Sequence, residues 1–235
     1  MEVSIIVPAY NEAKLIKESM SELLKFSKEN DFDYEIIVVD DGSRDDTKKI
    51  VSKIKDIKLI SYHKNRGKGY AVRQGILAAT KENIVIIDAD IPWELELMKK
   101  LLDFQGHDIS IGSRAVSTSK TRKRPTFARR FLGMGFNRIT SLITGLRLGD
   151  TQSGFKAFKR KAARRIFEKQ TINGWAFDVE VLYLAKKYGY SVMEVPIDKV
   201  EQLDFRISKV KPVSDSIRMF FSLIKIRLND LSGKY

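Results

Sequence analysis

A run of four β-branched residues, Ile84-Val85-Ile86-Ile87, leads directly into Asp88-Ala89-Asp90. A short apolar run without polar alternation predicts a strand that is buried on both faces. Its two carboxylates then lie at the carboxyl edge, where open α/β sheets bind ligands. Two such carboxylates suit a hard divalent cation that also binds phosphate oxygens, and Ala89 leaves room for a substrate. The alternative is a plain strand end at which Asp90 caps the next helix.

Strand and helix patterns alternate along most of the chain. Short apolar runs predict strands at 3–7, 34–39, 57–60, 84–87, 108–111 and 191–195, with a further short strand ending near Phe158. Helical patterns predict helices at 11–28, from 45, and at 70–79, 94–102, 126–144, 175–187 and 214–231. This alternation indicates βαβ units, so we expect an α/β fold with a Rossmann-like, mostly parallel sheet flanked by helices.

The composition limits the metal chemistry and the cellular setting. The chain has 235 residues, of which 43% are hydrophobic and 31% charged, and this suits one globular domain. Because cysteine is absent, disulfides and zinc–thiolate sites are excluded, and aspartate oxygens remain as metal ligands. With no signal-peptide pattern and no run of about 18 apolar residues, we expect a cytoplasmic protein that does not cross a membrane by itself.

The net charge of +13 is concentrated in one part of the chain. Residues 109–149 include no acidic side chain, and they hold these cations: Arg114, Lys120, Arg122, Lys123, Arg124, Arg129, Arg130, Arg138 and Arg147. Such a block predicts an anionic partner, which can be a phosphate group, a lipid headgroup surface or a nucleic acid. A solvated basic face is the alternative, although such faces usually include acids. Nucleic acid is disfavoured because it leaves the aspartates at the strand ends unexplained.

A glycine loop, Gly67-Lys68-Gly69, precedes a predicted helix. It lacks the third glycine of a dinucleotide-binding fingerprint and follows the third predicted strand instead of the first, which argues against an NAD site. Arg66 and Lys68, next to a helix N-terminus, favour a turn that faces phosphate groups. A loop whose glycines only serve to adopt positive φ angles remains the alternative.

The C-terminal segment 214–231 predicts a helix with a wide apolar face. Its apolar stripe consists of Ile217, Phe220, Phe221, Ile224, Leu228 and Leu231. Such a face needs a cover, which is either the protein body or the interface of a bilayer with anionic headgroups. We favour packing against the body, because this is the usual fate of an amphipathic helix face.

Six motifs occur in the order that is typical of family 2 glycosyltransferases. They are residues 4–12 (SIIVPAYNE), 38–43 (VVDDGS), 66–69 (RGKG), 88–90 (DAD), 112–114 (GSR) and 150–156 (DTQSGFK). More narrowly, the chain resembles the dolichyl- and polyprenyl-phosphate sugar synthases. The motifs RGKG, DTQSGFK and 175–180 (WAFDVE) resemble the glucosyl branch. The resemblance extends to about Lys209. It implies a GT-A fold over 1–211, with a nucleotide-sugar half at 1–112 and an acceptor half at 113–211, followed by an amphipathic helix at 212–235.

The resemblance also implies roles for individual residues. The expected nucleotide-sugar site consists of Pro8, Tyr10, Glu12, Val39, Asp41, Lys68, Asp88, Ala89, Asp90, Arg114 and Lys209. Asp88 and Asp90 are expected to hold Mg²⁺ or Mn²⁺, and the acceptor phosphate is expected at Arg114, Arg129 and Arg130. Asp90, Arg114 and Arg129 are the expected catalytic residues. Asp150 and Asp178 either orient the acceptor loop or serve as structural caps, and Arg206 does not align cleanly with the family pattern.

The implied activity is an inverting transfer of a hexose to a lipid phosphate. UDP-glucose is the favoured donor and dolichyl or polyprenyl phosphate the acceptor. GDP-mannose as donor, or a soluble acceptor, remains an alternative. A lipid phosphate is already ionised near neutral pH, so its oxygen can attack without a strong general base. We therefore expect an enzyme that is peripheral on the cytoplasmic face of a membrane and does not bind nucleic acid.

Overall fold

In a computed structural model, which describes residues 1–91, 95–116, 138–197 and 212–235, the strands form one sheet of seven. In chain order they are β1 (Glu2–Ala9), β2 (Asp33–Asp40), β3 (Ile57–Ser61), β4 (Asn83–Ile86), β5 (Ile109–Ser113), β6 (Lys156–Lys159) and β7 (Val192–Pro196). Their order across the sheet is β3-β2-β1-β4-β6-β5-β7. All seven coincide with predicted strands, with shifts of one or two residues at their ends.

Strand β6 is the exception to a parallel arrangement. β1 pairs in parallel with β2 and β4, β2 with β3, and β5 with β7, whereas β6 runs antiparallel to both β4 and β5. The prediction of a mostly parallel sheet is therefore confirmed. The carboxyl ends of β1, β2, β4 and β5 consequently share one edge with the start of β6, and Asp41, Asp88, Arg114 and Lys156 lie at this edge.

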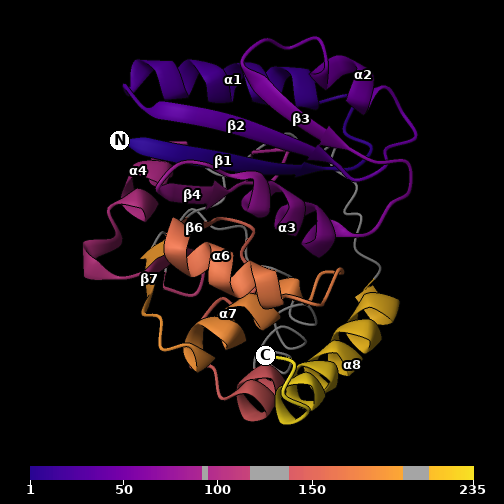
Figure 1. Ribbon diagram of the computed structural model, residues 1–235, viewed down its shortest axis with the longest axis vertical. Helices are drawn as coiled ribbons and strands as arrows, with labels where there is room; N and C mark the ends of the chain where they lie inside the picture. The colour runs from indigo at the N-terminus through magenta and orange to yellow at the C-terminus, as the bar shows by residue number, and fades with distance from the viewer. Residues whose placement is uncertain (92–94, 117–137, 198–211) are drawn as a thin grey trace.

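Helices cover both faces of the sheet (Figure 1). One face carries α1 (Ile16–Glu29), α2 (Thr47–Val51) and α4 (Leu97–Leu102), and the other carries α3 (Lys68–Ala78), α6 (Arg160–Lys169) and α7 (Phe177–Lys187). Outside this second layer lies α8 (Pro212–Leu231). A short 3₁₀ helix, η1 (Phe104–Gly106), precedes β5, and residues 138–144 form a further helical segment.

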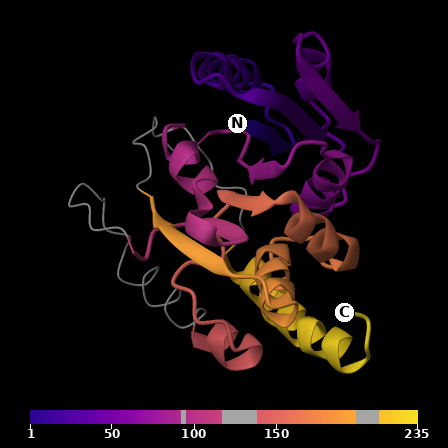
Figure 2. The same ribbon diagram turned by 60° about the vertical axis from the view of Figure 1, so that its left-hand side comes forward.

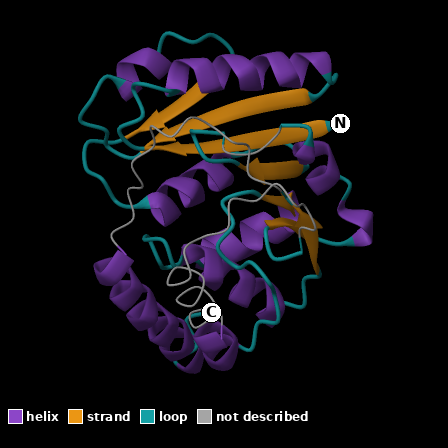
Figure 3. Cartoon of the chain, turned by 180° about the vertical axis from the view of Figure 1, so that it is seen from behind, coloured by secondary structure: helices purple, strands orange, loops and turns teal. Residues whose placement is uncertain are grey.

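The pleat of β1 explains why the sheet has two apolar faces. Val3, Ile5 and Val7 pack with α1 and α4, whereas Ile6 packs with α3 on the opposite face. All four side chains are buried, as a strand between two helical layers requires. Figure 3 shows the sheet from behind, with helices on either side of it.

Helix α6 was missed in the sequence patterns. Half of its ten residues, RKAARRIFEK, are basic, which masks a narrow apolar stripe. That stripe consists of Ala162, Ala163, Ile166 and Phe167, which are all buried against α3 and α7. Two pairs of adjacent apolar residues, one helical turn apart, are enough to pack a helix on its neighbours when two of the four side chains are large.

Helix α8 lies beside α7, at the end of the molecule opposite α1 (Figures 1 and 2). It packs on the body through Leu223, Ile226 and Asn229, which are buried. Packing of this helix on the body was expected, but the predicted stripe was wrong. In that stripe Phe221 is 63% exposed and Leu231 76% exposed, and Phe220, Ile224 and Leu228 are exposed as well. The expected body-facing surface thus faces solvent, because an adjacent, narrower face makes the contact.

Candidate active site

Two carboxylates follow β4 at the shared edge of the sheet. Asp88 and Asp90 are both half-buried, and Ala89 between them is buried. Gly154 lies directly against Asp88, so closely that a Cβ atom at residue 154 would collide with the carboxylate. A glycine at this position therefore lets the 150–156 turn approach Asp88, and leaves the carboxylate accessible, since 32% of its side chain is exposed.

Lys68, the first residue of α3, places a cation among these carboxylates. Its Nζ atom lies 2.6 Å from Oδ1 of Asp88 and 5.4 Å from the ring centroid of Trp175. Burial alone would lower the pKa of Lys68, but the charges of Asp88, Asp178 and Asp90 raise it above its ordinary value. Lys68 is therefore a permanent cation at the end of β4. The predicted role of this turn, to face phosphate groups, stays a prediction.

A buried ion pair lies behind this group. Nζ of Lys156, at the start of β6, is 2.5 Å from Oδ1 of Asp178, at the start of α7, and both side chains are at most 5% exposed. Burial raises the pKa of Asp178, although Lys156 and Lys68 act in the opposite direction. Lys156 also donates to the carbonyl of Ser153. The pair thus anchors the 150–156 turn to α7, which supports an orienting role for Asp178 over that of a cap.

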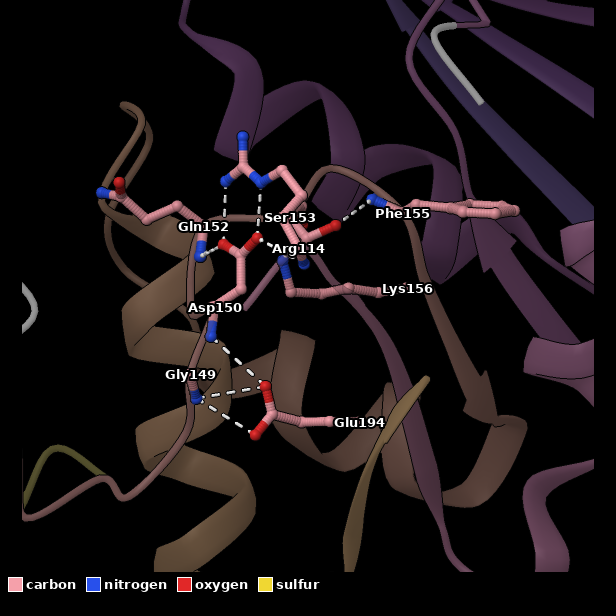
Figure 4. A network of polar contacts seen from close by, with 8 residues as sticks. All are labelled: Arg114, Gly149, Asp150, Gln152, Ser153, Phe155, Lys156 and Glu194. Carbon is pink, nitrogen blue, oxygen red and sulfur yellow. Dashed lines mark hydrogen bonds and ion pairs between the residues drawn. The ribbon is translucent and has the colours of Figure 1, made fainter. Parts of the chain in front are cut away.

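Arg114, after β5, forms a bidentate pair with Asp150 (Figure 4). Its Nε atom lies 2.5 Å from Oδ2 and its second terminal nitrogen 2.8 Å from Oδ1. Glu194 on β7 in turn accepts the backbone N–H groups of Gly149 and Asp150. Burial alone would raise the pKa of Asp150, but the hydrogen bonds and charge of Arg114 hold it below its ordinary value. Asp150 therefore orients Arg114, and 44% of the arginine side chain stays exposed.

Asp41, after β2, organises the loop that leads to Lys68. Its Oδ1 atom accepts hydrogen bonds from the Tyr62 hydroxyl and the Arg66 backbone, and Oδ2 accepts them from the Asn65 amide and the Gly67 backbone. The carboxylate is 3% exposed. Asp41 was expected beside the nucleotide, and this role stays a prediction. The structure adds that Asp41 fixes the backbone from which Lys68 projects.

The loops after β1 and β2 are hydrogen-bonded to each other at the carboxyl edge of the sheet. The backbone N–H of Glu12 donates to the Thr47 hydroxyl at 2.8 Å, and that of Asn11 to the Ser43 hydroxyl at 2.9 Å. Three residues at the end of β1 and in the loop that follows it are half-buried: Pro8, Tyr10 and Glu12. Val39 is fully buried in the core on the α3 side, so its side chain packs the sheet. The predicted contacts of Pro8, Tyr10, Glu12 and Val39 with a nucleotide remain predictions.

Four predicted site residues lie outside the described part of the chain. They are Arg129, Arg130, Arg206 and Lys209. Their roles at the acceptor or donor phosphates therefore remain predictions.

Two residues of the polar network were not assigned from sequence. Lys156 is a single lysine among apolar residues, between Phe155 and Ala157-Phe158, and such a position signals a buried ion pair. Glu194 interrupts the apolar β7 in the same way. In both cases the signal was the interruption of a strand pattern by one charge.

This arrangement can bind two anions side by side. Lys68 is paired with Asp88, and Arg114 is paired with Asp150. The negative charges of Asp178 and Asp88 act on both cations. Carboxylates and cations in alternation suit a metal-bound diphosphate next to a second phosphate. Among the described residues, no group of three or more histidine, cysteine or acidic side chains could hold a metal ion.

The family model described as Glycosyl transferase family 2 matches residues 4–167. Dolichyl-phosphate beta-glucosyltransferase of Dictyostelium discoideum is 38% identical over 250 residues, covering 98% of this chain and 75% of that protein. The Homo sapiens protein of the same name is 35% identical over 253 residues, covering 100% of this chain and 77% of its own length.

A solved structure shares the fold. The crystal structure of glucosyl-3-phosphoglycerate synthase from Mycobacterium tuberculosis in complex with Mn²⁺, uridine-diphosphate and phosphoglyceric acid superposes with a TM-score of 0.68. The two sequences are 18% identical, and the match covers 97% of this chain and 78% of that one. The expected GT-A fold is therefore confirmed.

Proposed function

The chain belongs to glycosyl transferase family 2 and is a glycosyltransferase, and we propose that it transfers glucose from UDP-glucose to dolichyl or polyprenyl phosphate. The names of the relatives support this donor and acceptor. The structural observation that carries the proposal is that two cations, Lys68 and Arg114, lie at one sheet edge, and that the charge of Asp88 acts on both of them.

Asp88 and Asp90 fit a divalent ion. Asp88 is accessible because residue 154 is a glycine, and it already pairs with a cation, the ammonium of Lys68. Asp88 and Asp90 would hold Mg²⁺ or Mn²⁺, and the donor diphosphate would supply further ligands. When bound, the ion offsets the negative charge that develops on the departing nucleotide. Complexes of a fold relative with Mn²⁺ and UDP support a divalent ion, and the choice between the two ions belongs to the proposal.

The two cationic side chains act on different phosphate groups, one on the donor and one on the acceptor. Lys68 neutralises the donor diphosphate, next to the bond that breaks. Arg114, held in orientation by Asp150, binds the acceptor phosphate and aligns its oxygen with the anomeric carbon. In-line attack inverts that carbon, so an α-linked donor gives a β-linked lipid phosphate. The buried Lys156–Asp178 pair keeps the 150–156 turn in place during this reaction.

A lipid acceptor requires contact with a membrane surface, and α8 supplies a suitable face. None of the helices in the described ranges has the length and apolarity of a membrane crossing. On α8, the exposed side chains of Phe221, Ile224, Leu228 and Leu231 recur three or four residues apart, and Arg218 and Lys225 are exposed on the same helix. The segment 138–144, which carries the exposed Leu142, lies at the same end of the molecule (Figures 1 and 2). Apolar side chains with neighbouring cations suit an anionic bilayer interface, here on the cytoplasmic face.

A transfer assay with matched donors and acceptors tests the proposal. The enzyme is incubated with Mn²⁺ or Mg²⁺, labelled UDP-glucose or GDP-mannose, and either a short polyprenyl phosphate or 3-phosphoglycerate. We expect label in the lipid phase from UDP-glucose alone, with a β anomeric configuration by proton NMR. Transfer from GDP-mannose alone would overturn the donor assignment, and transfer to 3-phosphoglycerate alone would overturn the acceptor assignment.

A further inference from the structure

Trp175 is an exposed aromatic side chain at the point where an exposed loop leads into the buried start of α7. It is 40% exposed, whereas the next three residues, Ala176, Phe177 and Asp178, are all at most 4% exposed. The indole thus faces out of the turn that begins α7, and Asp178, of the buried ion pair, follows one helical turn later. A large aromatic ring that contributes little to the core suggests a role at the surface that it faces.

The loop that carries Trp175 is held at two points on the N-terminal side of this residue. The carbonyl of Asn173 accepts the backbone N–H of Gly69 at 2.7 Å, at the start of α3. The carboxylate of Glu180, which is fully buried, accepts the backbone N–H groups of Thr171 and Ile172. The loop therefore holds the indole in one place relative to the start of α3, which is the element that carries Lys68.

The neighbours of the ring place it next to the proposed diphosphate position. The Lys68 ammonium lies over the indole at 5.4 Å from its centroid, and the same nitrogen is 2.6 Å from the Asp88 carboxylate. The Lys68 side chain therefore links the ring to Asp88, which is one of the proposed metal ligands. The Asp41 loop approaches Lys68 from its N-terminal side, through Gly67, whereas Trp175 lies in the turn before α7, the helix that carries Asp178 of the buried pair.

We propose that Trp175 is the platform on which the hexose of the nucleotide sugar stacks. The inference rests on the proposed function and adds a residue that recognises the sugar. In a nucleotide sugar the hexose is attached to the outer phosphate, so it projects beyond the diphosphate, on the side away from the base. With the base at the β1 and β2 loops and the diphosphate at Lys68, the hexose reaches the indole. The C–H face of a pyranose is weakly positive and apolar, which complements the negative face of an aromatic ring.

Binding of UDP-glucose and of UDP, compared in the same variants, tests this role. Dissociation constants are measured by calorimetry in the presence of Mn²⁺ for the wild type, Trp175→Leu and Trp175→Phe. Phe32→Leu, at the opposite edge of the sheet, is the control for a general loss of stability. Because an aromatic contact contributes up to roughly a tenfold change in affinity, we expect Trp175→Leu to weaken UDP-glucose about tenfold. Affinity for UDP, which lacks the hexose, should change less than about twofold, and Trp175→Phe should restore most of the loss.

The outcomes separate this inference from the proposed function. If the wild type binds neither UDP-glucose nor UDP, the proposed function falls, and the inference with it. If the wild type binds both and Trp175→Leu weakens them equally, or weakens neither, the platform role alone is overturned. A raised KM for polyprenyl phosphate with an unchanged affinity for UDP-glucose would likewise overturn it, because the ring would then serve the acceptor.

Discussion

Replacing Lys156 by methionine removes one charge of the buried pair and keeps most of the side-chain volume. Asp178 is then left 5% exposed without its partner at 2.5 Å. Loss of one member of a buried ion pair costs roughly 3–5 kcal/mol. Lys68 also acts on Asp178 by its charge, so we expect about 3 kcal/mol, the lower end of this range. For a chain of this size, that loss lowers the Tm by roughly 6–12 °C.

The dependence of this loss on pH follows from the pKa of Asp178. Burial raises the pKa of Asp178 in the folded protein, and removal of Lys156 raises it further. The folded variant therefore binds a proton more readily than the unfolded chain. Its stability falls as the pH rises above about 4, the ordinary aspartate range, and levels off above the raised folded-state pKa. The deficit relative to the wild type is thus greatest near neutral pH.

Thermal unfolding followed by circular dichroism between pH 4 and 8 measures both effects. Lys81→Met is the matched control, because the Lys81–Asp33 pair has a similar length of 2.6 Å but an Asp33 side chain that is 59% exposed. This control should lower the Tm much less than Lys156→Met, because water screens an exposed ion pair. The double variant Lys156→Met/Asp178→Asn should recover part of the loss, since it leaves no unpaired buried charge. A loss in Lys156→Met no larger than in the control, or a double variant as unstable as the single one, would refute the reasoning.

Three further predictions follow from the site and from α8. Asp90→Asn should weaken Mn²⁺ binding in the presence of UDP by roughly tenfold or more, and electron paramagnetic resonance showing an unchanged affinity would contradict the metal role. Arg114 holds the pKa of Asp150 below its ordinary value against the effect of burial, so the stabilisation by this pair is complete above about pH 4 and is lost as the pH falls below it. Asp150→Asn should therefore have a lower Tm at neutral pH and a flatter acid limb in the Tm–pH curve, and parallel curves for both proteins would argue against the pair. Phe221→Glu with Leu228→Glu should abolish sedimentation with anionic vesicles without lowering the Tm, and equal sedimentation of both proteins would exclude the α8 face as the membrane contact.

The alternation of strands and helices was predictable because buried parallel strands have a simple signature. Runs such as 84–87 are apolar on both faces, and this pattern is typical of a strand between two helical layers. The direction of β6 was not predictable, since a run of four residues carries no information on which neighbour it pairs with. Helix α6 was hidden by its basic residues, and the exposed face of α8 was misassigned because two faces of this helix are apolar.

The site was predictable as far as residue types at strand ends reveal it. The position of Asp88, Asp90 and Lys68 at one edge follows from the parallel topology. The partners inside the site required the tertiary structure. Asp150 is paired with Arg114, and Asp178 with Lys156, across more than twenty residues of chain, and no local pattern specifies such a pair.

The antiparallel direction of β6 separates the aspartates after β4 from the segment 115–149, although both belong to one continuous sheet. Strand β6 lies between β4 and β5 and runs antiparallel to both. The chain therefore leaves the carboxyl edge of the sheet at Arg114 and returns to it at Asp150. The bidentate Arg114–Asp150 pair joins these two points. Whatever sequence occupies residues 115–149, its two ends stay tied to the same point of the sheet. We therefore expect a change of sequence within residues 115–149 to leave the aspartates after β4 in their positions.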